Sequence, residues 1–254
     1  MIDGLSLLSK NDIPFISAEL NIHQPTLKEI GLIGEEAFFT GAQFLTIGKD
    51  AVSGVSSEDL KKISNFDVVL RLINDTSQEA RFNKACADSL LTLLFPEYQI
   101  LFLSNMIAFV KDGQNHIINE QNFDEFREIL KQMFCLDNMT GRPAPEYDPA
   151  NRHAEAIVNK IKAGRKKLAE IKSQQNNGQK VTILSRYLSI LAVGEQKDLN
   201  ALLQYSVYQL FDEFNRFSLR EQSDFYLEAK MAGAKDLQEV DNWMKDIHSS
   251  SEQN

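Results

Sequence analysis

The sequence is poor in the side chains on which metal centres and most active sites depend. Two of its 254 residues are cysteine, four are histidine and one is tryptophan. Cys86 and Cys135 lie far apart in segments predicted to be helical, so we expect both to be reduced, buried and structural. The histidines are scattered, and none has a cysteine or carboxylate at ligand spacing. The sequence therefore predicts no metal site and no cofactor.

Local catalytic motifs are also missing. No serine stands in a G-x-S-x-G turn, and no glycine cluster has the G-x-x-x-x-G-K-[ST] spacing of a phosphate loop. Two pairs of adjacent carboxylates, Glu35–Glu36 and Asp212–Glu213, diverge by about 100° on a helix, which is typical of a solvated face. We expect a protein that is not an enzyme. Catalytic groups that converge from distant positions remain the alternative.

Long apolar runs are absent, and none approaches the roughly 18 residues that cross a bilayer. The first residues carry Asp3 where an export signal would be basic, so we expect a cytosolic protein without a signal sequence. With 12 glycines and 6 prolines the chain is too poor in both for a fibrous or low-complexity protein. Its content of 43% hydrophobic and 25% charged residues is that of an ordinary globular protein.

The charge is unevenly distributed along the chain. The formal net charge is −9, which disfavours binding to nucleic acid or to an anionic membrane. Between residues 152 and 180, however, eight lysines and arginines face only two glutamates. No aromatic side chain in this segment could stack on bases, so nucleic acid is a secondary hypothesis. The segment could equally pair with acidic faces of its own fold or of a neighbouring copy. The candidate basic patch comprises Lys162, Arg165, Lys166 and Lys167.

The first half of the chain mixes strand and helix patterns. Residues 16–22 alternate as a strand, and a capping box of Thr26 and Glu29 predicts a helix over 27–47, which its three glycines weaken. Residues 99–103, 106–110 and 116–118 predict strands, the last two joined by a turn at 111–114. A helix capped by Asn122 follows.

The second half is predicted to be entirely helical. Three prolines and a glycine near 141–149 indicate a linker between an α+β domain (1–140) and a helical domain (150–248). The helical domain begins with a basic helix over 152–172. Further helices are predicted over 183–193, 199–217, 225–233 and 237–247, and the tail 249–254 is expected to be disordered. The predicted fold class is α+β, predominantly α-helical, with a small antiparallel hairpin and a C-terminal helical bundle.

Aromatic side chains are concentrated in this last part of the chain. Such residues pack into a core more often than they bind a partner, and Trp243 is expected to lock the last helix or to anchor a partner. The candidate partner-binding residues are Tyr205, Tyr208, Phe211, Phe214 and Trp243.

Several blocks of the sequence resemble a family of proteins encoded by phages and prophages of Gram-positive bacteria, among structural and tail genes. These blocks are PTLKEIGLIGEEAFF, ISNFDVVLRLI, IAFVKDGQNHIINEQNFDEFREIL, YDPANRHAEAIVNKIKAGRKKLAEIK, LSRYLSILAVG, LLQYSVYQLFDEFNRF and GAKDLQEVDNWMKDI. They cover nearly the whole chain in order. The resemblance offers no catalytic residues.

The resemblance implies a role in phage morphogenesis. Our preferred interpretation is a tail assembly chaperone in the host cytoplasm that shields an apolar stretch of the tape-measure protein or tube subunit through helix surfaces. One alternative is a structural subunit of the virion, such as a tail-completion or baseplate-associated protein. Another is a nucleic-acid-binding regulator that uses the basic helix. Homo-oligomerisation stays open.

Overall fold

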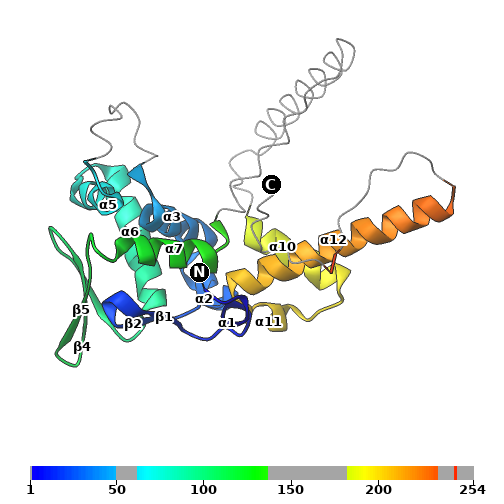
Figure 1. The fold of residues 1–254 in the computed structure, drawn as a ribbon, viewed down its shortest axis with the longest axis horizontal. Coiled ribbons are helices and arrows are strands. Elements are labelled where there is room, and N and C mark those ends of the chain that lie inside the picture. The colour runs from blue at the N-terminus through cyan, green and yellow to red at the C-terminus, as the bar shows by residue number, and fades with distance from the viewer. Residues whose placement is uncertain (1, 50–61, 137–181, 234–242, 245–254) are drawn as a thin grey trace, which may run out of the picture. The chain divides into compact units, whose positions relative to one another are not determined.

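The computed structural model describes residues 2–49, 62–136, 182–233 and 243–244 (Figure 1). Its N-terminal elements are α1 (Gly4–Leu8), β1 (Ile13–Phe15), the 3-10 helix η1 (Ile16–Ala18), β2 (Leu20–Ile22), α2 (Leu27–Ile33) and α3 (Glu35–Thr46). Next come α5 (Asn65–Asn74), α6 (Gln78–Leu94), β3 (Gln99–Phe102), β4 (Ile107–Lys111), β5 (Gln114–Ile118) and α7 (Phe123–Met133). The last elements are α10 (Ile183–Gly194), α11 (Leu199–Leu202) and α12 (Val207–Met231).

The fold class is α+β and mostly helical, as the sequence predicts. Strands β3, β4 and β5 form an antiparallel sheet in that order. The two residues of the β4–β5 turn, Asp112 and Gly113, both have positive φ, which suits the twist of a tight hairpin. The predicted hairpin is therefore confirmed, with strand ends within two residues of the expected positions.

The predicted strand over 16–22 is wrong in detail. Residues 13–15 and 20–22 form a two-stranded antiparallel sheet, in which Phe15 pairs with Leu20. Between them, η1 ends at Glu19, whose φ of 53° lies in the left-handed region and reverses the chain. A short hairpin thus replaces the single strand.

The predicted continuous helix over 27–47 is also wrong. It divides at Gly34, whose φ of 87° ends α2 and precedes α3. Only a glycine adopts that conformation without steric cost. The predicted capping box at the start is confirmed, because Thr26 and Glu29 exchange both hydrogen bonds. At Gly41 the backbones of α3 and α6 lie close together, because an added Cβ would lie 2.6 Å from the backbone carbonyl oxygen of Cys86.

The predicted helix divisions near the C-terminus are shifted. The helix that Asp198 caps ends after one turn as α11. A new helix starts after Ser206, because Ser206 and Gln209 form a second capping box. This helix, α12, then runs without interruption through residues 223–225, where a separate helix is predicted. The predicted last helix, 237–247, lies largely outside the described residues.

The core around α3, α6 and α7 is rich in phenylalanine. Phe126 of α7 is fully buried and lies with its ring centroid 5.6 Å from that of Phe15, 6.3 Å from that of Phe95 and 6.4 Å from that of Phe123. These four rings come from β1, α7 and the end of α6. The aromatic cluster therefore joins the small N-terminal sheet to the helices.

The contacts between Cα atoms group residues 1–136 and 184–254 into one compact unit. Within this unit α12 contacts α1 and α7. The predicted linker at 141–149 and the predicted disordered tail at 249–254 lie outside the described residues, so the proposed division into domains 1–140 and 150–248 stays a prediction.

Candidate functional site

The five candidate partner-binding residues have different environments. Tyr208 and Phe211 are buried, so their side chains pack inside the fold. Phe214 is half-buried, and its ring stacks on that of Tyr187 with 3.6 Å between centroids. Tyr205 is half-buried, and Trp243 is 39% exposed. Of the five, Trp243 is therefore the most accessible.

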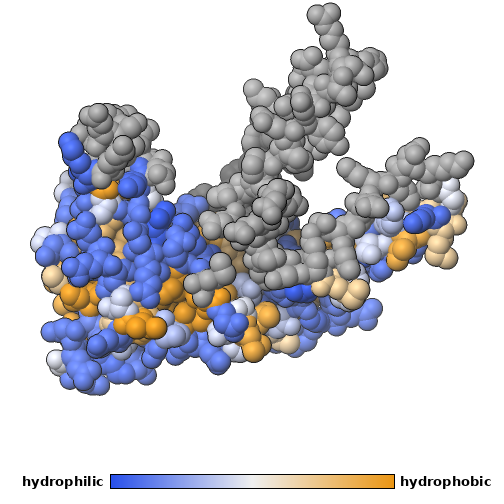
Figure 2. Space-filling model, viewed as in Figure 1, coloured by the Kyte–Doolittle hydropathy of each residue, from blue (hydrophilic) through white to orange (hydrophobic). Residues whose placement is uncertain are grey.

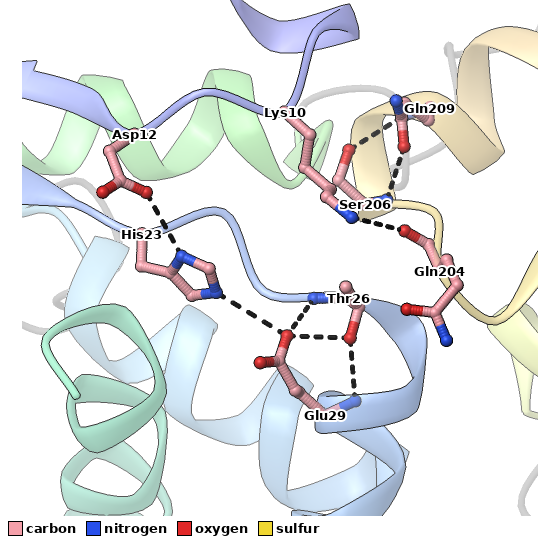
Figure 3. Close-up of polar contacts among 8 residues, drawn as sticks. All are labelled: Lys10, Asp12, His23, Thr26, Glu29, Gln204, Ser206 and Gln209. Atoms are coloured by element: carbon pink, nitrogen blue, oxygen red, sulfur yellow. Dashed lines mark hydrogen bonds and ion pairs between the residues drawn. The ribbon is translucent and has the colours of Figure 1, made fainter.

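The start of α12 is fixed against the start of α2 (Figure 3). Thr26 and Ser206 form an isolated antiparallel bridge, so the two capping boxes lie beside one another. The backbone N–H of Leu27 donates to the carbonyl of Tyr205 at 2.8 Å. The N–H of Lys28 donates to the carbonyl of Leu203 at 2.9 Å. Two first-turn donors of α2, which no helix satisfies internally, are thus paired with the loop before α12.

Side chains of the N-terminal segment strengthen this junction. The Lys10 ammonium donates to the carbonyl of Gln204 at 2.9 Å, and the Gln209 amide donates to the carbonyl of Leu8 at 2.6 Å. The amide of Gln24, which is buried, donates to the carbonyls of Ser6 and Asn11. Lys10 and Gln209 thus connect the N-terminal segment with α12 and with the loop before it.

His23 and Glu29 complete the polar cluster. The imidazole of His23 lies 3.2 Å from a carboxylate oxygen of Asp12 and 3.6 Å from one of Glu29. Burial raises the pKa of Glu29, but hydrogen bonds from the backbone and hydroxyl of Thr26, together with His23, outweigh it and leave the pKa below its usual range. Glu29 is therefore a structural carboxylate of the cap.

A groove of about 430 Å³ runs along the first half of α12. Its wall is formed by apolar side chains, namely Leu8, Tyr205, Phe217 and Trp243, and by charged ones. The charged side chains are joined in ion pairs: Arg220 with Glu195 at 2.8 Å, Arg216 with Asp212 at 3.4 Å, and Lys197 with Glu213. Arg216 and Arg220 line the groove beside three carboxylates, and Lys197, which does not line it, pairs with the third. Each lining carboxylate therefore has a cationic partner, so the groove has no strong preference for a charged ligand.

The second half of α12 exposes large apolar side chains. Phe225 is 73% exposed, Leu227 is 52% exposed and Met231 is 88% exposed. We call these three residues the distal α12 surface. Figure 2 shows apolar side chains at the surface over the last turns of this helix. Because one end of α12 is fixed and the other carries exposed apolar groups, the helix can present those groups to another molecule.

The start of α10 is bound by a residue far away in the sequence. The carboxylate of Glu35, at the start of α3, accepts hydrogen bonds from the backbone N–H of Leu184 at 2.9 Å and of Ser185 at 3.4 Å. A carboxylate at this position satisfies donors that the helix leaves unpaired and interacts favourably with the helix dipole. Glu35 therefore fastens α10 onto α3.

We expect Glu35→Ala to lower the free energy of unfolding by about 1 kcal/mol, the usual cost of losing a helix cap. Urea denaturation followed by circular dichroism measures the change. Glu120→Ala, at an exposed position, is the control and should stay within about 0.5 kcal/mol of the parent chain. If both variants unfold at the same urea concentration, Glu35 contributes nothing to the stability of the fold.

The cysteines agree with the structural role expected from the sequence. Both are free and buried. Burial and the nearby Asp212 raise the pKa of the Cys135 thiol to about 12, and burial raises the pKa of Cys86. Thiols with raised pKa values stay protonated at neutral pH, so neither is an activated nucleophile.

Three further features predicted from the sequence are the basic patch, the absence of a metal site and the absence of a membrane-spanning helix. The candidate basic patch, Lys162, Arg165, Lys166 and Lys167, lies outside the described residues. Within the ranges that the structure describes, no three histidine, cysteine or carboxylate side chains form a group suited to a metal ion. No helix in those same ranges is long and apolar enough to cross a lipid bilayer.

The distal α12 surface was not predicted from the sequence, although a signal for it exists. Phe225 and Leu227 are two residues apart, which places them about 200° apart on a helix. They cannot both face one core, so at least one had to be exposed. The sequence predicts a separate helix over 225–233. Phe225 and Leu227 are therefore not placed on the same helix as the apolar residues of 199–217.

The C-terminal part of the chain is similar to a known protein family. Residues 173–248 match the family model of the YomV second domain. The matched range contains α10, α11, α12 and Trp243. No curated protein and no solved structure gives a significant match. The match to the YomV second domain is consistent with a phage protein family, in agreement with the resemblance of the sequence blocks.

Proposed function

We propose that this chain is a non-catalytic phage morphogenesis protein, and specifically a tail assembly chaperone in the host cytoplasm. It binds an apolar stretch of a tail component, the tape-measure protein or the tube subunit. The observation that carries this proposal is the distal α12 surface, with three large apolar side chains exposed on a helix whose other end is fixed. The match of residues 173–248 to the YomV second domain supports a phage context.

The proposed binding mode is helix-to-helix packing. Leu227 and Met231 are four residues apart and share one face of α12, and an apolar helix of the partner would pack against them. Phe225 lies about 200° from Leu227 around the helix, so a second segment of the same partner would cover it. Each such side chain contributes roughly 1.5–3 kcal/mol when it becomes fully buried, so three of them can support a specific complex. The neighbouring groove, with its balanced ion pairs, would accept an uncharged extension of the same segment. Trp243 lines that groove and would anchor this extension of the partner.

The test is co-expression of the tagged chain with its tail gene cluster, followed by affinity purification. We expect the tape-measure protein or tube subunit to co-purify, and the triple variant F225S/L227S/M231S to retain at least tenfold less of it. Because these side chains are exposed, the variant should fold normally. The matched control is L32S/F82S, which removes two exposed apolar side chains from α2 and α6 and should bind as the parent does.

Two results would reject the proposal. One is a chain that co-purifies with neither tail protein. The other is a triple variant that retains the partner as well as the parent chain does. Mass spectrometry of purified particles then separates the chaperone from the structural subunit, since only a subunit stays in the finished virion.

A further inference from the structure

A second groove lies on a different part of the fold, between α1, the first small sheet and α7. Its volume is about 420 Å³. Its apolar lining includes Ile13, Ile16 and Ile129, and three carboxylates line it as well: Asp3, Glu125 and Glu128. Ile13 and Ile129 are buried, whereas Ile16 is 78% exposed. We call this feature the acid-rimmed groove.

The acid-rimmed groove carries an excess of negative charge. Among the described residues, no lysine or arginine side chain lines it. Glu125 accepts a hydrogen bond from the Ser17 hydroxyl, and Asp3 accepts one from the backbone N–H of Ser6 at 3.2 Å, and both contacts leave the carboxylate charge in place. Glu128 forms ion pairs with Lys131 at 2.8 Å and with Arg127 at 3.9 Å, so the excess charge comes from Asp3 and Glu125. A complementary ligand therefore combines apolar side chains with positive charge.

The sequence contains a segment with this composition. Residues 152–172 carry seven lysines and arginines against two glutamates, with apolar side chains at helical spacing: Ile157, Ile161, Leu168 and Ile171. The proposed function leaves this segment without a role. Leu136, three residues after the end of α7, is the last described residue before the gap at 137–181. Residue 152 follows sixteen positions later. Such a connection spans at most about 50 Å, which allows the segment to reach a neighbouring molecule.

We propose that the acid-rimmed groove binds the basic segment 152–172 of a second copy of this chain. Isoleucines of the groove contact the apolar side chains of the segment, and the rim carboxylates pair with its lysines and arginines. Because each copy has one groove and one segment, two copies can exchange segments reciprocally and form a closed dimer. This assembly is independent of tail-protein binding by the distal α12 surface.

The electrostatic part of this contact sets its salt dependence. The Debye length falls from about 10 Å at 0.1 M salt to about 3 Å at 1 M, which screens charges at a solvent-exposed rim. Analytical ultracentrifugation of the full-length chain should show a concentration-dependent dimer at 0.1 M salt and a dimer dissociation constant at least tenfold higher at 1 M. A chain that stays monomeric at 0.1 M salt and high concentration overturns the proposal.

Charge-reversal variants test the contact between the rim carboxylates and the basic segment. The variants E125K/E128K and K166E/K167E each bring like charges together, so each alone should be monomeric. An equimolar mixture should form dimers again, because it restores one native pairing and creates one reversed pairing. The control D224N/E228Q changes two exposed carboxylates of α12 and should dimerise as the parent chain does. Circular dichroism confirms that each variant is folded.

Two further measurements make the test independent of any one variant. A synthetic peptide of residues 152–172 should dissociate the dimer of the parent chain and should not bind E125K/E128K. Ile16→Ser, at an exposed position, should weaken the dimer about equally at low and high salt. Reversed variants that each dimerise normally, or a mixture that stays monomeric, reject the pairing. Neither result affects the pull-down of tail proteins, so the two proposals fail separately.

Discussion

Replacing Phe126 by alanine lowers the free energy of unfolding by about 3–5 kcal/mol. The ring is fully buried and contacts three other phenylalanine rings, so its removal leaves a cavity that rigid aromatic neighbours cannot fill. Urea denaturation, followed by circular dichroism and by tryptophan fluorescence, measures the loss. The loss would be a large share of the total stability of an ordinary protein.

Phe225→Ala is the matched control for that experiment. It removes the same ring from a position that is 73% exposed. Its free energy of unfolding should stay within about 0.5 kcal/mol of the parent chain. If Phe126→Ala proved as mild as Phe225→Ala, the aromatic cluster would not be the centre of the core.

Gly41→Ala is the second substitution with a large expected effect. The new Cβ would lie 2.6 Å from the carbonyl oxygen of Cys86 and 3.2 Å from the Cβ of Leu90, so α3 and α6 must move apart. Because the nearer atom belongs to the backbone, no side-chain rotation relieves the clash. We expect a loss of about 1–3 kcal/mol, larger than the gain in helix propensity. Thermal unfolding by calorimetry gives the change.

Gly31→Ala separates the packing effect from helix propensity. Gly31 is another glycine of the predicted helix over 27–47, yet nothing lies within 4 Å of a Cβ added there. The free energy of unfolding should rise by up to about 1 kcal/mol, because alanine favours the helix more than glycine does. An equal loss at both positions would mean that the loss at Gly41 does not come from the close contact between α3 and α6.

Local signals in the sequence predicted the local structure well. The Asp112–Gly113 turn and the Thr26–Glu29 capping box each lie within a few residues, and both have the expected form. The errors arose where two local signals compete. At Gly34 a helical pattern continues through a residue that can also end a helix, and only tertiary packing decides. At Ser206 a capping box opens a new helix inside an apolar pattern that continues across it.

The candidate site could be predicted only in part, for a different reason. Glu35 and Leu184 are 149 positions apart, and no local pattern links a carboxylate on one helix to the first turn of another. Trp243 is a candidate from the sequence because it is the single tryptophan, and its side chain is 39% exposed. Residue type alone makes Tyr208 and Phe211 candidates, but their burial depends on which face of α12 meets α1 and α7. That orientation is a property of the whole fold.

The backbone hydrogen bonds between the start of α2 and the loop before α12 affect how the chain is made. During synthesis Leu27 and Lys28 leave the ribosome well before Leu203 and Tyr205, whose carbonyls they need. Contacts between such distant residues form slowly, because a long loop must close first. The nascent N-terminal segment therefore cannot reach its final form on its own, and a truncated product that ends before α11 would keep these donors unpaired.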